Sequence, residues 1–396
     1  MASFDPAAAT AAYMAQLSPA AHAKATAYTQ GGHWLLLWGW LVTVAACVLI
    51  ARSRVLDRVR TGLQRRQPRP LLAALVVSIL FMAFDWLLEL PWSSYADWWR
   101  ERQYGLTSQP WIGWLVDNAL VFAVTLPLVG VFFVALYALV RRAPRTWPLW
   151  TGVVVGAFLV FGAWAQPAVV EPMVNHYAPA PPGPVRDLVV AMGKAYGVPT
   201  DRIFVYNGSK QSNRYTANVA GLFGSARVAL SDTMFAQGAD LAEVRGVVGH
   251  EMGHYVMHHV LWGSLFQAVM AVLAALGVRW LFPVVRGWVG ARGVMGIDDP
   301  AGLPIVFLVF VTLSLLATPI LNTWTRMQEA AADSFSLEHA HEPDGLARAL
   351  VKTIAYRASS PSDLEAFLFY NHPSVEHRVR KAMDWKAAHP NEKPAP

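Results

Sequence analysis

The sequence contains almost no cysteine. Cys47 is the only one among 396 residues, and it lies within an apolar run. A disulfide framework within one chain is therefore excluded, and a closed structural zinc site, which often uses several cysteines, is disfavoured. Residues 1–32 also lack the charged start and apolar core of a signal peptide, so we interpret this alanine-rich stretch as a loose or helical lead-in.

Charged residues are scarce as well. They make up 15% of the chain, hydrophobic residues make up 55%, and the mean hydropathy is +0.33. This balance is typical of a membrane protein. The net charge of +6 comes mainly from arginine. Because the arginines cluster in short loops beside apolar runs, we attribute them to lipid headgroups and topology, and we expect no nucleic-acid partner.

Apolar runs of bilayer length predict a predominantly α-helical polytopic membrane protein with about six transmembrane helices. The second span carries Asp85 and Glu89, which are costly in lipid and should face either a protein interior or the interface. The expected spans are His33–Ile50, Leu71–Leu90, a segment within Val116–Val140, Trp147 to about Ala168, Val260–Phe282 and Leu303–Leu321. The chain would thus divide into a lead-in (1–32), four spans with their loops (33–169), a soluble insert (170–259), two spans (260–322) and a C-terminal helical region with a polar tail (323–396). The loops among the first four spans include a basic one (52–70) and an aromatic-rich one (91–110).

The soluble insert has the pattern of a small α+β unit. A proline-rich connector at 177–186 leads into an amphipathic helix over Val185–Tyr196. An edge of a small sheet can pair with an extended substrate and hold its peptide bond in register. The expected strands are Ile203–Tyr206, Thr216–Leu222 and Ala226–Leu230, the last two joined by a turn at 223–225.

Near the end of the insert lies a His-Glu-x-x-His pattern made of His250, Glu251 and His254. Residues four apart share one face of a helix, so both imidazoles can bind one ion while Glu251 reaches a water on it. Zn²⁺ suits these ligands, and a catalytic zinc site takes three protein ligands and leaves the fourth position to water. We therefore predict one zinc ion per chain, with Glu251 as the general base.

A third ligand is available downstream. Glu329 and Asp333 are also four residues apart, in an alanine-containing run that favours a helix. We predict that Glu329 binds the metal and that Asp333 accepts a hydrogen bond from a ligand imidazole, which would fix its tautomer. For this pair taken alone, a solvated acidic face is the competing interpretation.

These two motifs, placed between hydrophobic segments, resemble the Ste24 type of CAAX prenyl protease, in the M48 group of zinc metallopeptidases. Other motifs agree with the resemblance and extend it over most of the chain: Leu90–Tyr95, Tyr104–Thr107, Trp114–Asp117, Ile203–Lys210, Ser212–Asn213, Val228–Thr233, and Asn371–Pro373 with Arg378. The chain departs from the family at Arg214, where a small residue is more common.

The resemblance implies further site residues. It places a substrate strand at Asn213 and at 216–220, with Thr216 and Asn218 as candidate contacts. It also implies a substrate or transition-state role for His372 and Arg378. From the residues alone, His372 could donate to the oxyanion of an attacked peptide carbonyl or could equally belong to a surface loop.

The zinc motif is expected to lie at the membrane edge. Residues 241–259 contain no proline and run into the fifth span, so one long helix could carry His250 about 15 Å from the apolar boundary. Glu329 lies a similar number of residues beyond the sixth span, and two antiparallel helices would bring both ligands to one depth. His258 and His259 are interpreted as ordinary helix residues, not as further ligands.

The sequence therefore predicts a monomeric integral-membrane zinc endopeptidase that cleaves membrane-associated, hydrophobic or prenylated CAAX proteins. Two other hypotheses stay open: a transporter whose path is lined by Asp85, Glu89 and Asp117, and an inactive zinc-binding scaffold. The membrane would be the inner membrane of a bacterium or the endoplasmic reticulum of a eukaryote. Basic loops place the zinc domain outside the cytoplasm, whereas the resemblance places it on the cytosolic side, which we favour. The resemblance also indicates one N-terminal span fewer than in longer relatives.

Overall fold

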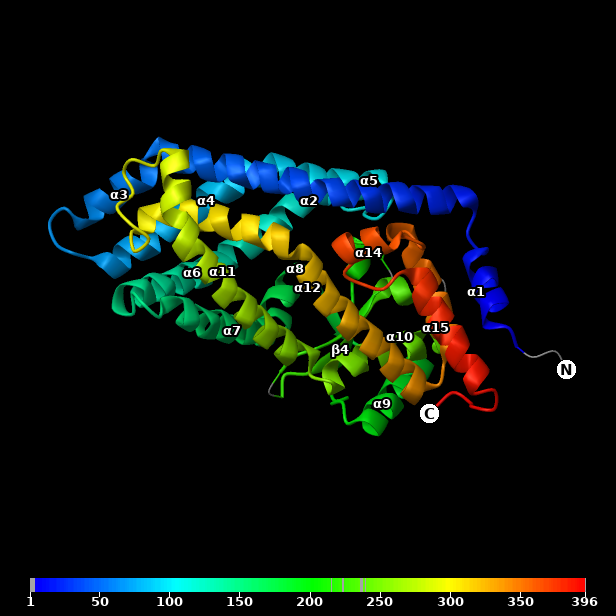
Figure 1. Cartoon of the computed structure of the whole chain (residues 1–396). Helices are drawn as coiled ribbons and strands as arrows, with labels where there is room; N and C mark the ends of the chain where they lie inside the picture. The colour runs from blue at the N-terminus through cyan, green and yellow to red at the C-terminus, as the bar shows by residue number, and fades with distance from the viewer. Residues whose placement is uncertain (1–3, 215, 223, 236–237, 239, 396) are drawn as a thin grey trace.

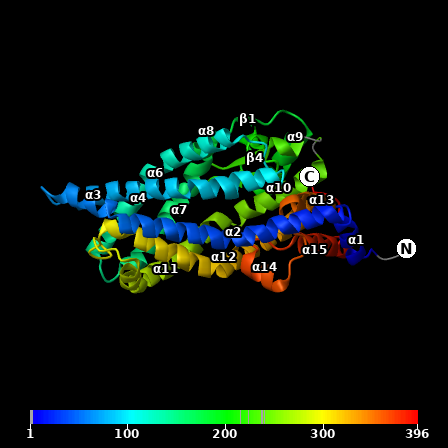
Figure 2. The same ribbon diagram turned by 90° about the horizontal axis from the view of Figure 1, so that it is seen from above.

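The computed structural model describes residues 4–214, 216–222, 224–235, 238 and 240–395. A long bundle of helices carries a compact domain of helices and a small sheet at one end (Figure 1). Both termini lie at the domain end, and the short helix α3 (Val55–Gln64) lies at the opposite end in both views (Figures 1 and 2).

Within the described residues, six helices are long and apolar enough to cross a membrane, which confirms the predicted number. These candidate spans are Pro19–Ser53, Pro70–Gln103, Trp111–Arg142, Trp147–Val174, His259–Val289 and Pro300–Ala340. They contain the helices α2 (Pro19–Ser53), α4 (Pro70–Ser93), α6 (Trp111–Arg142), α7 (Trp147–Ala165), α11 (His259–Val289) and α12 (Leu303–Ala340).

A segment predicted as a loop is partly helical, since the basic loop at 52–70 contains α3. The lead-in, predicted as loose or helical, contains α1 (Pro6–Met14) and the first turns of α2. The prediction of an aromatic-rich loop at 91–110 was also wrong for the first part of that segment. The helix α4 continues past Pro91 into a π-helical turn, Ser94–Trp99, and a last short helix, α5 (Arg100–Gln103). A wider turn accommodates a proline that would otherwise end the helix.

The domain contains one sheet among the described residues, with strand order β1-β2-β4-β3. β2 (Ile203–Tyr206) is parallel to β4 (Arg227–Ser231), and β3 (Ala217–Ala220) is antiparallel to β4. These three strands match the predicted ones within a few residues, and the predicted turn at 223–225 lies partly outside the described residues. β1 (Tyr177–Pro179), which pairs antiparallel with β2, lies in the stretch predicted as a connector.

The predicted single helix through the zinc motif is divided in two. α10 (Leu241–Val256) ends before His258, whose φ of 55° is left-handed, and α11 begins at His259. Left-handed backbone cannot continue a helix, so the chain bends at this point although it contains no proline. His258 is exposed, as the prediction of an ordinary residue requires.

The sixth span, by contrast, runs without a break from the membrane into the domain. α12 is 38 residues long and packs along α10. On the side of α9 and the sheet, α10 contributes Val248 and Met252 to a core that includes Met192 and Leu230. The remaining elements are α8 (Glu171–Val174), α9 (Pro184–Tyr196), α13 (Pro343–Lys352), α14 (Asp363–Phe369), α15 (Val375–Ala388), the π-helical turn η2 (Gln166–Val170), and the 3₁₀ turns η3 (Gly208–Lys210), η4 (Asp232–Phe235), η5 (Pro300–Gly302) and η6 (Thr353–Tyr356).

Candidate metal centre

Two glycines let α10 approach its neighbours closely. A Cβ atom at Gly249 would lie 2.9 Å from Ser336 Oγ on α12, and one at Gly246 would lie 2.7 Å from the Leu346 backbone nitrogen on α13. Ser336 also donates a hydrogen bond of 2.8 Å to the Gly246 carbonyl. Because this packing fixes α10 against α12, the side chains of the two predicted metal motifs face one another.

The structure brings His250, His254 and Glu329 together. Their potential ligand atoms all lie within 4.8 Å of one another. His250 Nε2 is 3.2 Å from His254 Nε2 and 3.3 Å from Glu329 Oε2, and His254 Nε2 is 3.5 Å from Glu329 Oε1. A tetrahedral zinc ion with bonds of about 2.0–2.1 Å requires ligand atoms about 3.3 Å apart. The donor set therefore fits zinc.

Glu329 itself shows why an ion belongs here. Its Oε2 atom is buried and accepts no hydrogen bond from the described residues. A buried carboxylate oxygen without a hydrogen bond is costly unless a cation compensates it. The nearby ring nitrogens of His250 and His372, both 3.3 Å away, can act as donors only when protonated.

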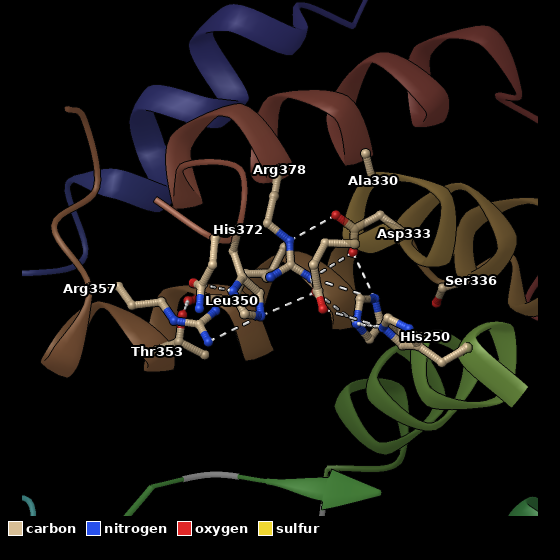
Figure 3. A network of polar contacts seen from close by, with 12 residues as sticks. His250, Ala330, Asp333, Ser336, Leu350, Thr353, Arg357, His372 and Arg378 are labelled. Carbon is tan, nitrogen blue, oxygen red and sulfur yellow. Dashed lines mark hydrogen bonds and ion pairs between the residues drawn. The ribbon is translucent and has the colours of Figure 1, made fainter. Parts of the chain in front are cut away.

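His250 is held from behind by a buried ion pair. Its Nδ1 donates to Asp333 Oδ1 at 2.9 Å, and Arg378 donates to both oxygens of Asp333, at 2.7 and 2.8 Å (Figure 3). This bond leaves Nε2 free for a metal, as predicted for Asp333. Burial lowers the pKa of His250, but its hydrogen bond to Asp333 and the nearby carboxylate of Glu329 outweigh burial and raise the pKa to about 9. Arg378, predicted to contact substrate, has Asp333 as its main partner.

His254 has a different support. Its Nδ1 lies 2.9 Å from Nδ1 of His259, the first residue of α11. Burial, and then the charge of His250, lower the pKa of His254 to about 4, so its ring is neutral and ready to bind a metal. His259 is a helix residue, as predicted, but its contact with His254 was not predicted. The bend at His258, which no proline or glycine announces, is what turns His259 towards the centre.

Glu251 lies one position along α10 and is half-buried. Its carboxylate makes no hydrogen bond or ion pair with the described residues. Burial raises its pKa to about 7. A carboxylate with a pKa near neutrality and no fixed partner is suited to accept a proton and return it.

His372 completes the centre on the side of the C-terminal helices. Its Nδ1 is 2.8 Å from Asn371 Oδ1, and its Nε2 is 3.3 Å from Glu329 Oε2 and 3.4 Å from a guanidinium nitrogen of Arg357. Burial, and then the charge of Arg357, lower the pKa of His372 to about 3. Arg357 was not among the predicted site residues, and no sequence motif points to it.

The predicted substrate residues lie at the sheet edge. β3, which contains Asn218, is the last strand of the sheet and packs against α10. Thr216 is exposed just before β3. Asn213 precedes β3 by four residues, and its side chain donates a hydrogen bond to the Gly105 carbonyl at 3.2 Å. The adjacent Arg214 forms an ion pair with Glu101 at 2.9 Å, which links this loop to α5. We attribute the arginine at this position, where the family more often has a small residue, to that ion pair.

An apolar cavity of about 830 Å³ opens beside the centre. It lies between α6, α7, α11 and α12, and it reaches His259 and Asn371, the neighbours of His254 and His372. Most of its lining consists of hydrophobic side chains from the spans, among them Leu128, Phe132, Phe158, Phe266 and Leu321.

Comparison with known families agrees with this site. A family model described as peptidase family M48 matches residues 179–386, more than half of the chain. The chain belongs to peptidase family M48. A second model, described as CAAX prenyl protease N-terminal, five membrane helices, matches residues 6–176. Together they confirm the predicted resemblance and show that the protein is a multi-pass membrane metallopeptidase.

Individual relatives of this M48 protein are distant. The uncharacterized metalloprotease YhfN of Bacillus subtilis is 27% identical over 302 residues, covering 74% of this chain and 69% of the relative. CAAX prenyl protease 1 of Saccharomyces cerevisiae is 24% identical over 328 residues, covering 77% and 71%. The crystal structure of S. mikatae Ste24p has a TM-score of 0.75 and 19% identity and covers 93% of this chain and 90% of that one, which shows that the fold is shared.

Proposed function

We propose that this M48 metallopeptidase is a zinc endopeptidase whose centre is formed by His250, His254 and Glu329. The spacing of their three donor atoms, 3.2 to 3.5 Å, is the observation that carries the proposal. M48 metallopeptidases are in general zinc-dependent. A bound zinc ion would supply a Lewis acid that polarises a peptide carbonyl and lowers the pKa of water.

The chain's own residues have separable roles in hydrolysis. Glu251 accepts a proton from the attacking water and delivers it to the leaving amine. Asp333, held by Arg378, fixes the tautomer and orientation of His250. The Nδ1 atom of His372 donates to Asn371 Oδ1 at 2.8 Å, so its Nε2 would donate to the developing oxyanion in the protonated ring.

The proposed substrates are hydrophobic or prenylated proteins associated with the membrane. The apolar cavity beside the centre supports this choice, because a lipid or apolar side chain can occupy it while the peptide bond reaches Glu251. The relatives named as CAAX prenyl proteases support it as well. We further propose that an extended segment pairs with the β3 edge and contacts Thr216 and Asn218, with Asn213 holding the adjoining loop.

We also propose that the protein acts as a monomer with its centre on the cytosolic side of the membrane. A reporter fused after Pro396 tests the orientation, because the C-terminus lies at the same end as the domain (Figure 1). Activity of the reporter only outside the cytoplasm would contradict the orientation without affecting the chemistry.

Cleavage of a quenched hydrophobic peptide by the detergent-purified protein tests the activity. We expect the wild type to cleave, a chelator to stop cleavage, and Glu251→Gln to retain zinc while losing at least about a hundredfold in kcat, since a general base contributes that much or more. If the wild type binds zinc but cleaves no member of a broad peptide panel, prenylated peptides included, the endopeptidase proposal fails and a zinc-binding scaffold is the better account.

A further inference from the structure

Arg357 is a cation beside the metal centre with no anionic partner. It follows the 3₁₀ turn η6, and its guanidinium contacts Nε2 of His372 at 3.4 Å. Figure 3 shows the two side chains directed towards each other, beside the group that contains Asp333 and Arg378. Among the described residues, no carboxylate oxygen lies within 4.0 Å of Arg357, the limit for an ion pair.

Two neighbouring arginines of the domain are compensated. Arg378 is paired with Asp333 through two hydrogen bonds, and Arg214 is paired with Glu101. Burial lowers the pKa of Arg357, and the positive charges of Arg378 and Arg214 act in the same direction, whereas Tyr356 and Glu329 oppose them. The guanidinium has five donors and is partly buried, and its described neighbours are the neutral rings of His372 and Tyr356, so it has unused capacity to bind an anion.

The position of Arg357 limits where such an anion can lie. His372 stands between Arg357 and the metal ligand Glu329, at 3.4 Å from one and 3.3 Å from the other. A carboxylate paired with Arg357 would therefore lie within about three residues of the scissile bond, because an extended chain advances about 3.3–3.6 Å per residue.

We propose that Arg357 binds a carboxylate of the substrate close to the scissile bond and thereby determines specificity. The carboxylate belongs either to the free C-terminus or to an acidic side chain, since both offer the planar pair of oxygens that a guanidinium recognises. This inference rests on the proposed peptidase function. A substrate would then need a carboxylate near the scissile bond as well as an apolar group that fits the cavity.

Three peptides of one hydrophobic sequence distinguish the two sources. The first ends in a free carboxylate three residues beyond the scissile bond, the second ends there in an amide, and the third ends in the amide but carries one aspartate within those three residues. The wild type is expected to cleave one or both carboxylate peptides with a kcat/KM about tenfold above that of the neutral amide, as expected for one charge-assisted pair. Preference for the first peptide identifies the C-terminus, and preference for the third identifies a side chain.

Variants then assign the preference to Arg357. Arg357→Gln should bring the ratio of kcat/KM close to one, mainly by raising KM for the carboxylate peptide, and Arg357→Lys should retain part of it. Arg380→Gln is the matched control, because Arg380 is an exposed arginine of the same region paired with Asp384. It should keep the wild-type ratio. Zinc content and thermal unfolding of each variant verify that the protein is folded, and Arg357→Lys decides the question if Arg357→Gln does not fold.

Two results would overturn the inference. Equal cleavage of all three peptides by the wild type would show that no carboxylate is recognised. An equal fall in kcat for all three peptides in Arg357→Gln would show that Arg357 only positions His372. If the wild type cleaves none of them, the endopeptidase proposal fails instead, so the two failures are distinguishable.

Discussion

The two histidines of the metal centre have contrasting surroundings. His250 faces the inside of the domain, where Asp333 and Arg378 are 2% and 6% exposed and form a charged, fixed support. His254 faces the bundle, where its neighbour His259 lies on the wall of the apolar cavity. One side of the centre is thus built from permanent charges, and the other is built from neutral rings beside hydrophobic spans.

This difference separates two tasks. Charges held away from water keep a fixed geometry, so the domain side is suited to retain the ion and define its ligands. A neutral, partly exposed side beside a cavity can accept substrates without displacing a charge pair. We therefore expect changes on the domain side to affect metal content first, and changes on the cavity side to affect substrate selection.

The largest effect is expected from Glu329, which joins both sides. Glu329→Gln removes the only carboxylate of the donor set, so bound zinc should fall from one ion per chain towards zero and peptide cleavage should be lost. Metal analysis of the purified variant, with activity in parallel, measures this. Glu338→Gln, an exposed position on the same helix, is the control and should retain both zinc and activity. A Glu329→Gln protein with full zinc would remove Glu329 from the ligand set.

A smaller effect is expected on the domain side alone. Asp333→Asn keeps the size of the side chain but removes the charge that orients His250, and such partners of metal ligands are worth about 10–100-fold in metal affinity. Competition for zinc with a chelator of known affinity measures the change. An unaltered affinity would show that the Asp333 contact does not support the ligand.

Zinc uptake should also depend on pH, because His250 must lose a proton before it can bind the ion. The pKa of His250 in the metal-free protein is raised to about 9, so the proton is present at neutral pH and is lost as pH rises. Zinc affinity should therefore increase about tenfold per pH unit between about pH 6 and pH 8. In Asp333→Asn the pKa is no longer raised, and the increase should be smaller. A pH-independent affinity in the wild type would contradict the raised pKa.

The two metal motifs and the spans were easier to predict from sequence than the contacts around the centre. His250, His254 and Glu251 follow from helical spacing, and Glu329 with Asp333 follows from the same spacing on a second helix. The six spans follow from hydropathy. These signals are local, so a single sequence contains them.

What the sequence did not indicate depends on contacts between distant segments or on backbone details. β1 is three residues long and ends in Pro179, so it has strand character only because β2 lies beside it. The bend at His258 has no proline or glycine to mark it, and the contact of His259 with His254 was not predicted for that reason. Arg357 is singled out because no carboxylate among the described residues pairs with it, and this can be recognised only in the three-dimensional structure.

The smallest effect is expected on the cavity side. Gly263 of α11 lines the cavity, and a Cβ atom there would have Gln328 Nε2, at 3.9 Å, as its only neighbour within 4 Å. Gly263→Leu should therefore fill part of the cavity and raise KM for long hydrophobic peptides by about fivefold, which corresponds to about 1 kcal/mol, the lower end of what one methylene group is worth in a pocket. Zinc content and cleavage of short peptides should change little. Gly287→Leu is the control, since Gly287 lies on the same helix with no atom within 4 Å and outside the cavity. Equal effects of the two substitutions would mean that the cavity does not hold the substrate, and the division of tasks between the two sides of the centre would then lose its support.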